Sequence, residues 1–204
     1  MLTVDVQHGA MGYETTAAFA MLRVLAGCLA GVWARVLVGR MLDAGAEGMI
    51  GPTAEAPKEA ATRRYPPEGR RSFGPTRPFV TEGLGYHRTA NARVLPVVMI
   101  ETAAAIEEIC AVPGLGGVYV GPTDLGIVLG LPAGGDREDQ GFLDAVRRVR
   151  DAARAAGVMA CMHAGSADYA RRMAAEGFDL VTAAADYDLL LGAARERTRA
   201  VRDD

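Results

Sequence analysis

Lysine is almost absent from this sequence of 204 residues, since Lys58 is the only lysine among 22 basic side chains. An enzyme that forms a Schiff base needs a lysine amine on a desolvated wall of its site. Lys58 belongs to the polar segment 54–64, whose pattern predicts a solvated helix. The composition therefore argues against any mechanism that passes through an imine.

Two further absences narrow the class of protein. The net charge of −3 leaves no excess of basic residues, which excludes the usual signature of a nucleic-acid partner. No apolar run reaches the roughly 18 residues that a membrane span needs. The Ala/Leu/Val-rich stretch 17–38 is interrupted by Arg23 and Arg35 and lacks the pattern of a signal peptide. These features predict a cytoplasmic protein without a membrane partner, folded as one domain over residues 1–204.

Cysteine is also scarce, and the three residues Cys28, Cys110 and Cys161 are far apart in the chain. Their spacing forms neither a metal-binding pair nor a disulfide framework. Each lies in an apolar stretch of helix or strand character. We therefore expect them to be small buried side chains of the core.

Segments of strand character alternate with segments of helix character along the chain. The expected strands are 2–6, 32–36, 48–50, 95–100, 117–120, 158–162 and 179–184. The expected helices are 13–26, 38–44, 54–64, 103–110, 140–156, 167–176 and 189–201. Repeated strand–helix units predict a parallel sheet with right-handed connections. Seven such units, without a glycine-rich phosphate loop after any strand, favour a TIM-type (β/α)-barrel over a doubly wound sheet. Residues 65–93, rich in glycine and proline, are expected to form a long loop excursion.

Two apolar runs, 97–100 and 118–120, are each followed closely by an acid, Glu101 and Asp124. A carboxylate at the end of a buried strand is costly unless it is paired or binds a cation. Either acid taken alone could be an ordinary structural residue, Glu101 at the start of a helix and Asp124 as the cap of a turn. As a pair on neighbouring strands they predict oxygen ligands for a hard divalent cation.

Other polar residues are expected at the same ends of strands. His8 follows the first strand and has the chemistry of a general base. Arg35, expected at the end of the second strand, could clamp a substrate oxygen or form an ion pair with Asp43. His163 and His87 are more typical of surface or supporting positions than of catalytic ones.

Five motifs in a fixed order carry a resemblance to a known family. They are the segments 5–9 (DVQHG), 41–46 (MLDAGA), 65–75 (YPPEGRRSFGP), 100–102 (IET) and 121–125 (GPTDL). In this order the chain resembles the HpcH/HpaI aldolase family over nearly its whole length. Its members are metal-dependent, class II pyruvate aldolases acting on 2-keto-3-deoxy sugar acids or 4-hydroxy-2-keto acids such as 4-hydroxy-2-oxo-heptanedioate.

The resemblance implies a (β/α)₈ barrel, commonly assembled as a hexamer in which the last helix packs on a neighbour. Because the first motif already begins at Asp5, we expect this chain to lack the first βα unit of the barrel. The implied activity is that of a carbon–carbon lyase, releasing pyruvate and an aldehyde through a metal-stabilised enolate. The implied cofactor is a divalent cation, Mg²⁺ or Mn²⁺, and the implied partners are a keto acid and copies of the chain.

The resemblance also assigns roles to residues of this sequence. The metal ligands would be Glu101 and Asp124. The catalytic residues would be His8 as the base, Asp43 as the acid paired with it, and Arg35 at the substrate carbonyl. The substrate carboxylate would lie in the backbone cradle of Gly121, Pro122, Thr123 and Asp124.

Two alternatives stay open at this stage. The first is a lyase acting on a CoA ester, of the citrate lyase β-like type, for which the segment 65–71 is a poorer match. The second is a truncated barrel without catalysis that serves as a binding or assembly subunit. A measurement of metal binding distinguishes the second alternative from the aldolase, because only the aldolase is expected to bind a divalent cation.

Overall fold

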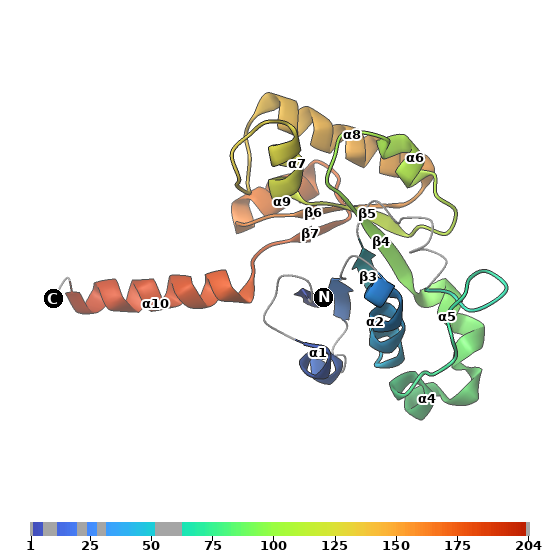
Figure 1. Cartoon of the computed structure of the whole chain (residues 1–204). Coiled ribbons are helices and arrows are strands. Elements are labelled where there is room, and N and C mark those ends of the chain that lie inside the picture. Colours follow the sequence, from blue (N-terminus) through green and yellow to red (C-terminus); the bar gives the residue numbers. More distant parts are fainter. Residues whose placement is uncertain (1, 6–11, 20–23, 28–31, 52–62, 203–204) are drawn as a thin grey trace.

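In the part of the chain that the structure describes, seven parallel strands in the order β1 to β7 form one sheet. The computed structural model describes residues 2–5, 12–19, 24–27, 32–51 and 63–202 (Figure 1). The strands are β1 Leu2–Asp5, β2 Val24–Gly27, β3 Gly48–Gly51, β4 Leu95–Ile100, β5 Gly117–Val120, β6 Met159–His163 and β7 Leu180–Thr182. Every neighbouring pair is parallel, which confirms the expected α/β fold built from repeated strand–helix units.

The connections between the strands are largely helical. They contain α1 Tyr13–Phe19, α2 Val32–Asp43, α4 Arg77–Glu82, η2 Gly83–Tyr86, α5 His87–Arg93, α6 Ile106–Cys110, α7 Pro122–Val128, α8 Gln140–Ala156 and α9 Ala167–Ala175. The chain then ends in the long helix α10 Asp186–Arg202. The helix expected over 54–64 falls mostly outside the described residues.

The second strand lies earlier in the chain than the sequence predicts. We expected a helix over 13–26, but α1 ends at Phe19 and Val24–Gly27 forms β2. In β2, Ala26 lies between Val4 of β1 and Met49 of β3. A run of four apolar residues has no period that separates helix from strand, so its place between two strands decides its conformation.

The expected strand over 32–36 is also wrong, because this segment is part of a helix. Residues Val32–Asp43 form the helix α2, in which Val38, Met41 and Leu42 are buried together. Their spacing of three and four residues places them on one face of a helix, against the core. The β-branched residues at the start of the segment suggested a strand, but the packing of this face outweighs that local preference.

The segment 65–93 is only partly the irregular excursion that we expected. Its second half forms α4, η2 and α5, and α4 begins with a proline in its first turn, where proline is well tolerated. Asn91 of α5 binds the backbone of Tyr65 in both directions. Its Oδ1 accepts from the amide nitrogen at 2.7 Å, and its Nδ2 donates to the carbonyl oxygen at 2.9 Å. The irregular half is thereby fixed to the helical half.

The two faces of the sheet bury different sets of side chains. On the outer face, Val98 and Ile100 of β4 belong to a large core with α6, α8 and α9, centred on residues such as Phe142. On the inner face, Val97 of β4 packs with Tyr119 of β5 and with side chains of the neighbouring strands. This alternation follows from the two-residue period of a strand. The inner face is the one that a barrel encloses.

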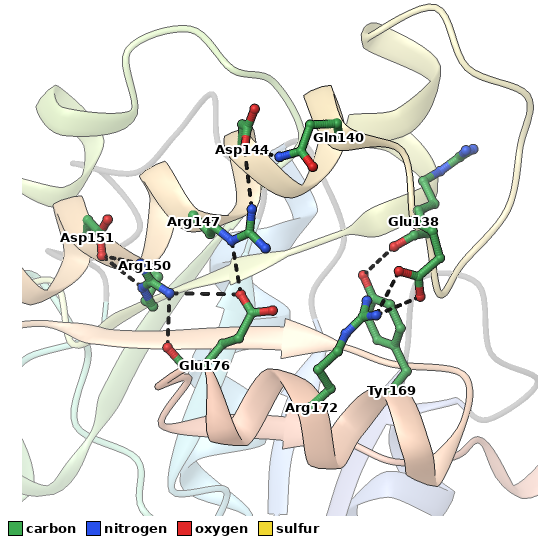
Figure 2. Close-up of polar contacts among 10 residues, drawn as sticks. Glu138, Gln140, Asp144, Arg147, Arg150, Asp151, Tyr169, Arg172 and Glu176 are labelled. Carbon is green, nitrogen blue, oxygen red and sulfur yellow. Dashed lines mark hydrogen bonds and ion pairs between the residues drawn. The ribbon is translucent and has the colours of Figure 1, made fainter.

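A network of ion pairs lies over the outer layer (Figure 2). Arg147 and Arg150 of α8 both reach Glu176 just after α9, with nitrogen–oxygen distances of 3.3 and 3.9 Å. Arg172 of α9 donates to both carboxylate oxygens of Glu138 at 2.8 and 2.7 Å. Ion pairs at or near the surface contribute little free energy, so the main effect of this network is to fix α8 and the segment before it against α9.

Helix α10 projects away from the rest of the chain (Figure 1). None of its described residues is buried, and it exposes the apolar side chains of Tyr187, Leu189 and Leu190. Within the described part of the chain, no helix combines the length and apolar character needed to cross a membrane.

Candidate functional site

The two predicted acidic ligands lie just beyond the C-terminal ends of β4 and β5. Glu101 directly follows β4, and Asp124 lies in the first turn of α7 rather than in the loop that we expected. The amide nitrogen of Gly121 donates to the carbonyl oxygen of Ile100 at 3.4 Å, so the parallel pairing continues past the last strand residues. A Cβ atom added to Gly121 would lie 3.7 Å from Oδ2 of Asp124. The Asp124 carboxylate therefore lies over the end of β5, beside the strand that leads to Glu101.

Glu101 does not lie at the start of a helix, so this structural explanation for its position is wrong. Helix α6 begins at Ile106, and the acids of its first turn are Glu107 and Glu108. Asp124 is not the cap of a turn either, because the N-cap of α7 is Gly121; Asp124 is the acid of the first turn of this helix, where a negative charge is favourable. Glu101 thus has a half-buried carboxylate that no helix terminus accounts for.

The pKa of Glu101 is raised above its ordinary value. The larger cause is partial burial, which disfavours the charged form, and the second is the negative charge of Asp124. The two carboxylates are therefore close enough to repel one another. A cation between them would remove both penalties.

The donor set of this pair fits a hard divalent cation. Among the described residues there is no group of three or more histidine, cysteine, aspartate or glutamate side chains that could hold a metal. Mg²⁺ is commonly held by one or two carboxylates, with water and substrate oxygens completing its coordination. Glu101 and Asp124 match that arrangement.

Asp43 is the last residue of α2, and its described partner is an arginine that sequence analysis did not single out. Nη2 of Arg71 donates to Oδ1 of Asp43 at 2.8 Å. The guanidinium of Arg71 is buried, with its carbon atom 4.6 Å from the ring centre of Tyr65, and it donates to the Tyr86 hydroxyl at 3.4 Å. Arg71 belongs to the motif 65–75, and this motif was the signal in the sequence that could have identified it.

The remaining predicted catalytic residues are placed less completely. His8 lies outside the described residues, so its pairing with Asp43 stays a prediction. Arg35 was expected at the end of a strand, but its backbone belongs to α2, because the second strand lies at Val24–Gly27. Its side chain is not among those described, and its role at the substrate carbonyl stays a prediction as well.

His163, expected at a surface or supporting position, faces the interior of the sheet at the end of β6. Its Nδ1 lies 3.2 Å from the Tyr119 hydroxyl and 3.0 Å from Oγ1 of Thr182. Those two hydroxyl oxygens are 3.2 Å apart, so the three groups form a closed triangle. Burial raises the pKa of Tyr119 to about 12, which keeps its hydroxyl protonated.

These features define a parallel (β/α)-barrel protein with paired acids beyond the C-terminal ends of neighbouring strands. Barrels of this kind carry their chemistry at that end. The chain belongs to the HpcH/HpaI aldolase/citrate lyase family, whose sequence model matches residues 4–193.

The chain is similar to individual members of this family over most of its length. It is 39% identical to the hydroxypyruvate/pyruvate aldolase of Rhizorhabdus wittichii, over 96% of this chain and 82% of that protein. The crystal structure of a family member from Burkholderia cenocepacia J2315 superposes with a TM-score of 0.82 at 31% identity, covering 98% of this chain and 84% of that one.

A more distant structure shares the fold. The protein CitE of Mycobacterium tuberculosis, crystallised in complex with magnesium and acetate, superposes with a TM-score of 0.55 at 19% identity. The match covers 90% of this chain and 75% of that one. The resemblance drawn from the five sequence motifs is confirmed at the level of the family.

Proposed function

We propose that this protein is a metal-dependent carbon–carbon lyase that cleaves 4-hydroxy-2-keto or 2-keto-3-deoxy acids to pyruvate and an aldehyde. The observation that carries the proposal is the pair Glu101 and Asp124 at the ends of adjacent strands. Their mutual repulsion, and the burial that raises the pKa of Glu101, is the electrostatic situation that a bound cation relieves. The similarity to a hydroxypyruvate/pyruvate aldolase supports pyruvate as the common product.

Glu101 and Asp124 would hold Mg²⁺ or Mn²⁺. When bound, such an ion supplies Lewis-acid stabilisation of negative charge on the oxygen atoms of a keto acid. The magnesium bound in the distant relative CitE supports the choice of a hard cation. A single lysine in the chain is consistent with a route that forms no imine.

The protein side chains would divide the remaining steps. His8 would accept the proton of the C4 hydroxyl, while the C3–C4 bond breaks and its electron pair passes to C3 and the C2 carbonyl oxygen. C4 leaves as the aldehyde carbon, and protonation of C3 completes the methyl group of pyruvate. The guanidinium of Arg35 would stabilise the charge that develops on the C2 oxygen. Asp43 would orient His8.

The backbone at the start of α7 would receive the other end of the substrate. Residues Gly121 to Asp124 turn from β5 into α7. Pro122 has no N–H group and that of Gly121 already donates to Ile100, so the N–H groups of Thr123 and Asp124 are the ones suited to the carboxylate of the keto acid. Gly121 is buried at this point, and a Cβ there would lie only 3.0 Å from the terminal methyl carbon of Met99. The glycine thus keeps the floor of the cradle free of a side chain.

The test is pyruvate release measured with and without metal. With Mg²⁺ or Mn²⁺ the protein should release pyruvate from 4-hydroxy-2-keto acids, and a chelator should abolish the release. Borohydride added during turnover should trap no adduct on the protein. Release of pyruvate that survives chelation would refute the metal role. A protein that binds no divalent cation in a calorimetric titration would instead be a barrel with a binding or assembly role.

We further propose that α10 packs on another copy of the chain. The helix buries nothing within its own chain and exposes Tyr187, Leu189 and Leu190. Apolar side chains gathered on a projecting helix are typical of a surface that a partner covers. A homo-oligomer, a hexamer by resemblance to the family, provides that partner.

A further inference from the structure

The polar triangle of His163, Tyr119 and Thr182 lies on the same face of the sheet as the paired acids. Tyr119 belongs to the inner core, together with Cys161 of β6 and Leu180 of β7. Side chains two residues apart on a strand share a face, so His163 and Thr182 also face inward. Their hydrogen bonds with Tyr119 agree with this placement.

The register of the strands places His163 at the level of the acids. Met99 pairs with Tyr119 and Tyr119 with Cys161, so the positions two residues further on, Glu101, Gly121 and His163, form the next layer. His163 in turn pairs with Thr182. Gly121 contributes no side chain to this layer. Over Gly121 lie instead the terminal methyl carbon of Met99 and Oδ2 of Asp124, 3.0 and 3.7 Å from the position that a Cβ atom would take, so the Asp124 carboxylate is at the level of this layer.

The hydrogen bonds of the triangle bear on which ring nitrogen of His163 carries the proton. Oγ1 of Thr182 accepts from the amide nitrogen of Ala164 at 3.3 Å, which leaves its hydroxyl hydrogen to be donated elsewhere. The phenol of Tyr119 stays protonated and has a hydrogen to donate as well. With two hydroxyl donors beside it, Nδ1 of His163 is best used as an acceptor. The proton of the neutral ring then lies on Nε2.

Nε2 of His163 is the ring nitrogen that extends farther from the backbone of β6. In the part of the chain that the structure describes, no hydrogen-bond partner lies against it, and the side chain is only partly buried. The triangle thus holds the ring through Nδ1 and, with Nδ1 as the acceptor, leaves the Nε2–H group as a hydrogen-bond donor.

We propose that His163 is a specificity-determining residue, whose Nε2–H donates a hydrogen bond to an oxygen substituent on the aldehyde half of the substrate. This inference rests on the proposed aldolase function. Strands β4 and β6 are separated by two strand spacings, or about 10 Å. A keto acid held by its C1 and C2 oxygens beside Glu101 and Asp124 extends over that distance with the carbons beyond C4. Tyr119 and Thr182 act as positioning residues for the ring.

The test compares two aldehydes that differ only in a polar group. Glycolaldehyde carries a hydroxyl where propanal carries a methyl group, and both are offered with pyruvate and Mn²⁺ to the full chain. We expect His163→Leu to lower the ratio of kcat/KM for glycolaldehyde to that for propanal by about 3- to 10-fold, the value of one neutral hydrogen bond. Thr182→Val should lower the same ratio by a smaller factor, because the ring loses one of its two supports. KM for pyruvate should stay unchanged in both variants.

Matched controls separate this effect from a general loss of structure. Thr198→Val removes a hydroxyl of α10 that donates to the carbonyl oxygen of Ala194, and it should leave the ratio unchanged. Tyr169→Phe removes a buried hydroxyl on the outer face, bonded to the carbonyl oxygen of Arg137, and should also leave the ratio unchanged. An unchanged ratio in His163→Leu would overturn the inference.

A measurement on the unmodified protein covers the case in which a variant does not fold. Long-range nitrogen–proton spectra at about pH 8 distinguish the two neutral tautomers of histidine. We expect Nε2–H for His163, whereas His87 should show Nδ1–H because its Nδ1 lies 2.8 Å from the carbonyl oxygen of Leu84. An Nδ1–H signal from His163 would overturn the inference.

The same preparation tests the proposed function separately. Exchange of the methyl protons of pyruvate for deuterium, dependent on metal, reports enolate formation without any aldehyde. If exchange is absent and no pyruvate is released, the proposed function itself fails. If exchange occurs but the aldehyde ratio is unchanged in His163→Leu, only the assignment of His163 fails.

Discussion

Replacing Glu101 by glutamine removes one charge from the carboxylate pair while keeping the shape of the side chain. In the wild type, a cation at 100 times its dissociation constant stabilises the folded state by about 2.7 kcal/mol. For a chain of this length, 1 kcal/mol shifts the melting temperature by about 2–4 °C. Saturating Mg²⁺ or Mn²⁺ should therefore raise the melting temperature of the wild type by roughly 5–10 °C.

The variant should lose this shift and gain stability without metal. Because the pKa of Glu101 is raised in the folded state, the native protein binds more protons than the unfolded chain over the range just above pH 4. The free energy of unfolding of the wild type, measured in chelator, should therefore fall as the pH rises through that range. Glu101→Gln has no such charge, so in chelator at neutral pH it should melt at a temperature equal to or above that of the wild type.

Differential scanning calorimetry in chelator, Mg²⁺ and Mn²⁺ measures both effects. Glu108→Gln is the matched control, since Glu108 is an exposed acid of α6 on the outer layer and should keep the full metal shift. A metal shift that persists in Glu101→Gln would refute the assignment of Glu101 as a ligand. A wild type that shows no shift would refute the site as a whole.

Three other predictions concern the scaffold. Arg71→Met leaves Asp43 without its buried partner and should cost about 3 kcal/mol in urea unfolding, part of which Asp43→Asn in the same chain restores. Met173→Ala, at a fully buried position of α9, should cost about 2–5 kcal/mol in the same assay, and a value below 1 would contradict the described core. Serine at both Leu189 and Leu190 should move the protein toward the monomer in sedimentation velocity, and an unchanged sedimentation coefficient would argue against α10 as the interface.

The elements with clear periodic patterns were predicted most closely. The helix over 140–156 has the expected bounds, because its apolar residues recur on one face and Gly157 ends it with a positive φ of 70°. The strands β4 and β5 also lie where the sequence places them, as uninterrupted apolar runs bounded by proline or glycine. Two of the three predicted core cysteines, Cys110 and Cys161, are buried, and Cys28 lies outside the described residues.

The misassigned segments are those in which local preference and packing disagree. Val32 to Asp43 contains β-branched and aromatic residues that favour a strand, yet it forms α2. The loop expected around Asp124 is the short helix α7, begun by Pro122 in its first turn. The chain 65–93 was expected to be irregular from its glycines and prolines, although half of it is helical. For α2 and for the segment 65–93, contacts with other elements outweigh the local signal.

The sequence by itself determined the family, the parallel strand–helix order and the two acids that end neighbouring strands. It could do so because a buried parallel strand is a local apolar run, and a carboxylate at its end is conspicuous against that run. Only the tertiary structure decided that Asp43 faces Arg71 and that His163 shares a layer with Glu101. Those contacts depend on strand register and on which face each side chain takes, and both are set by pairing between residues far apart in the chain.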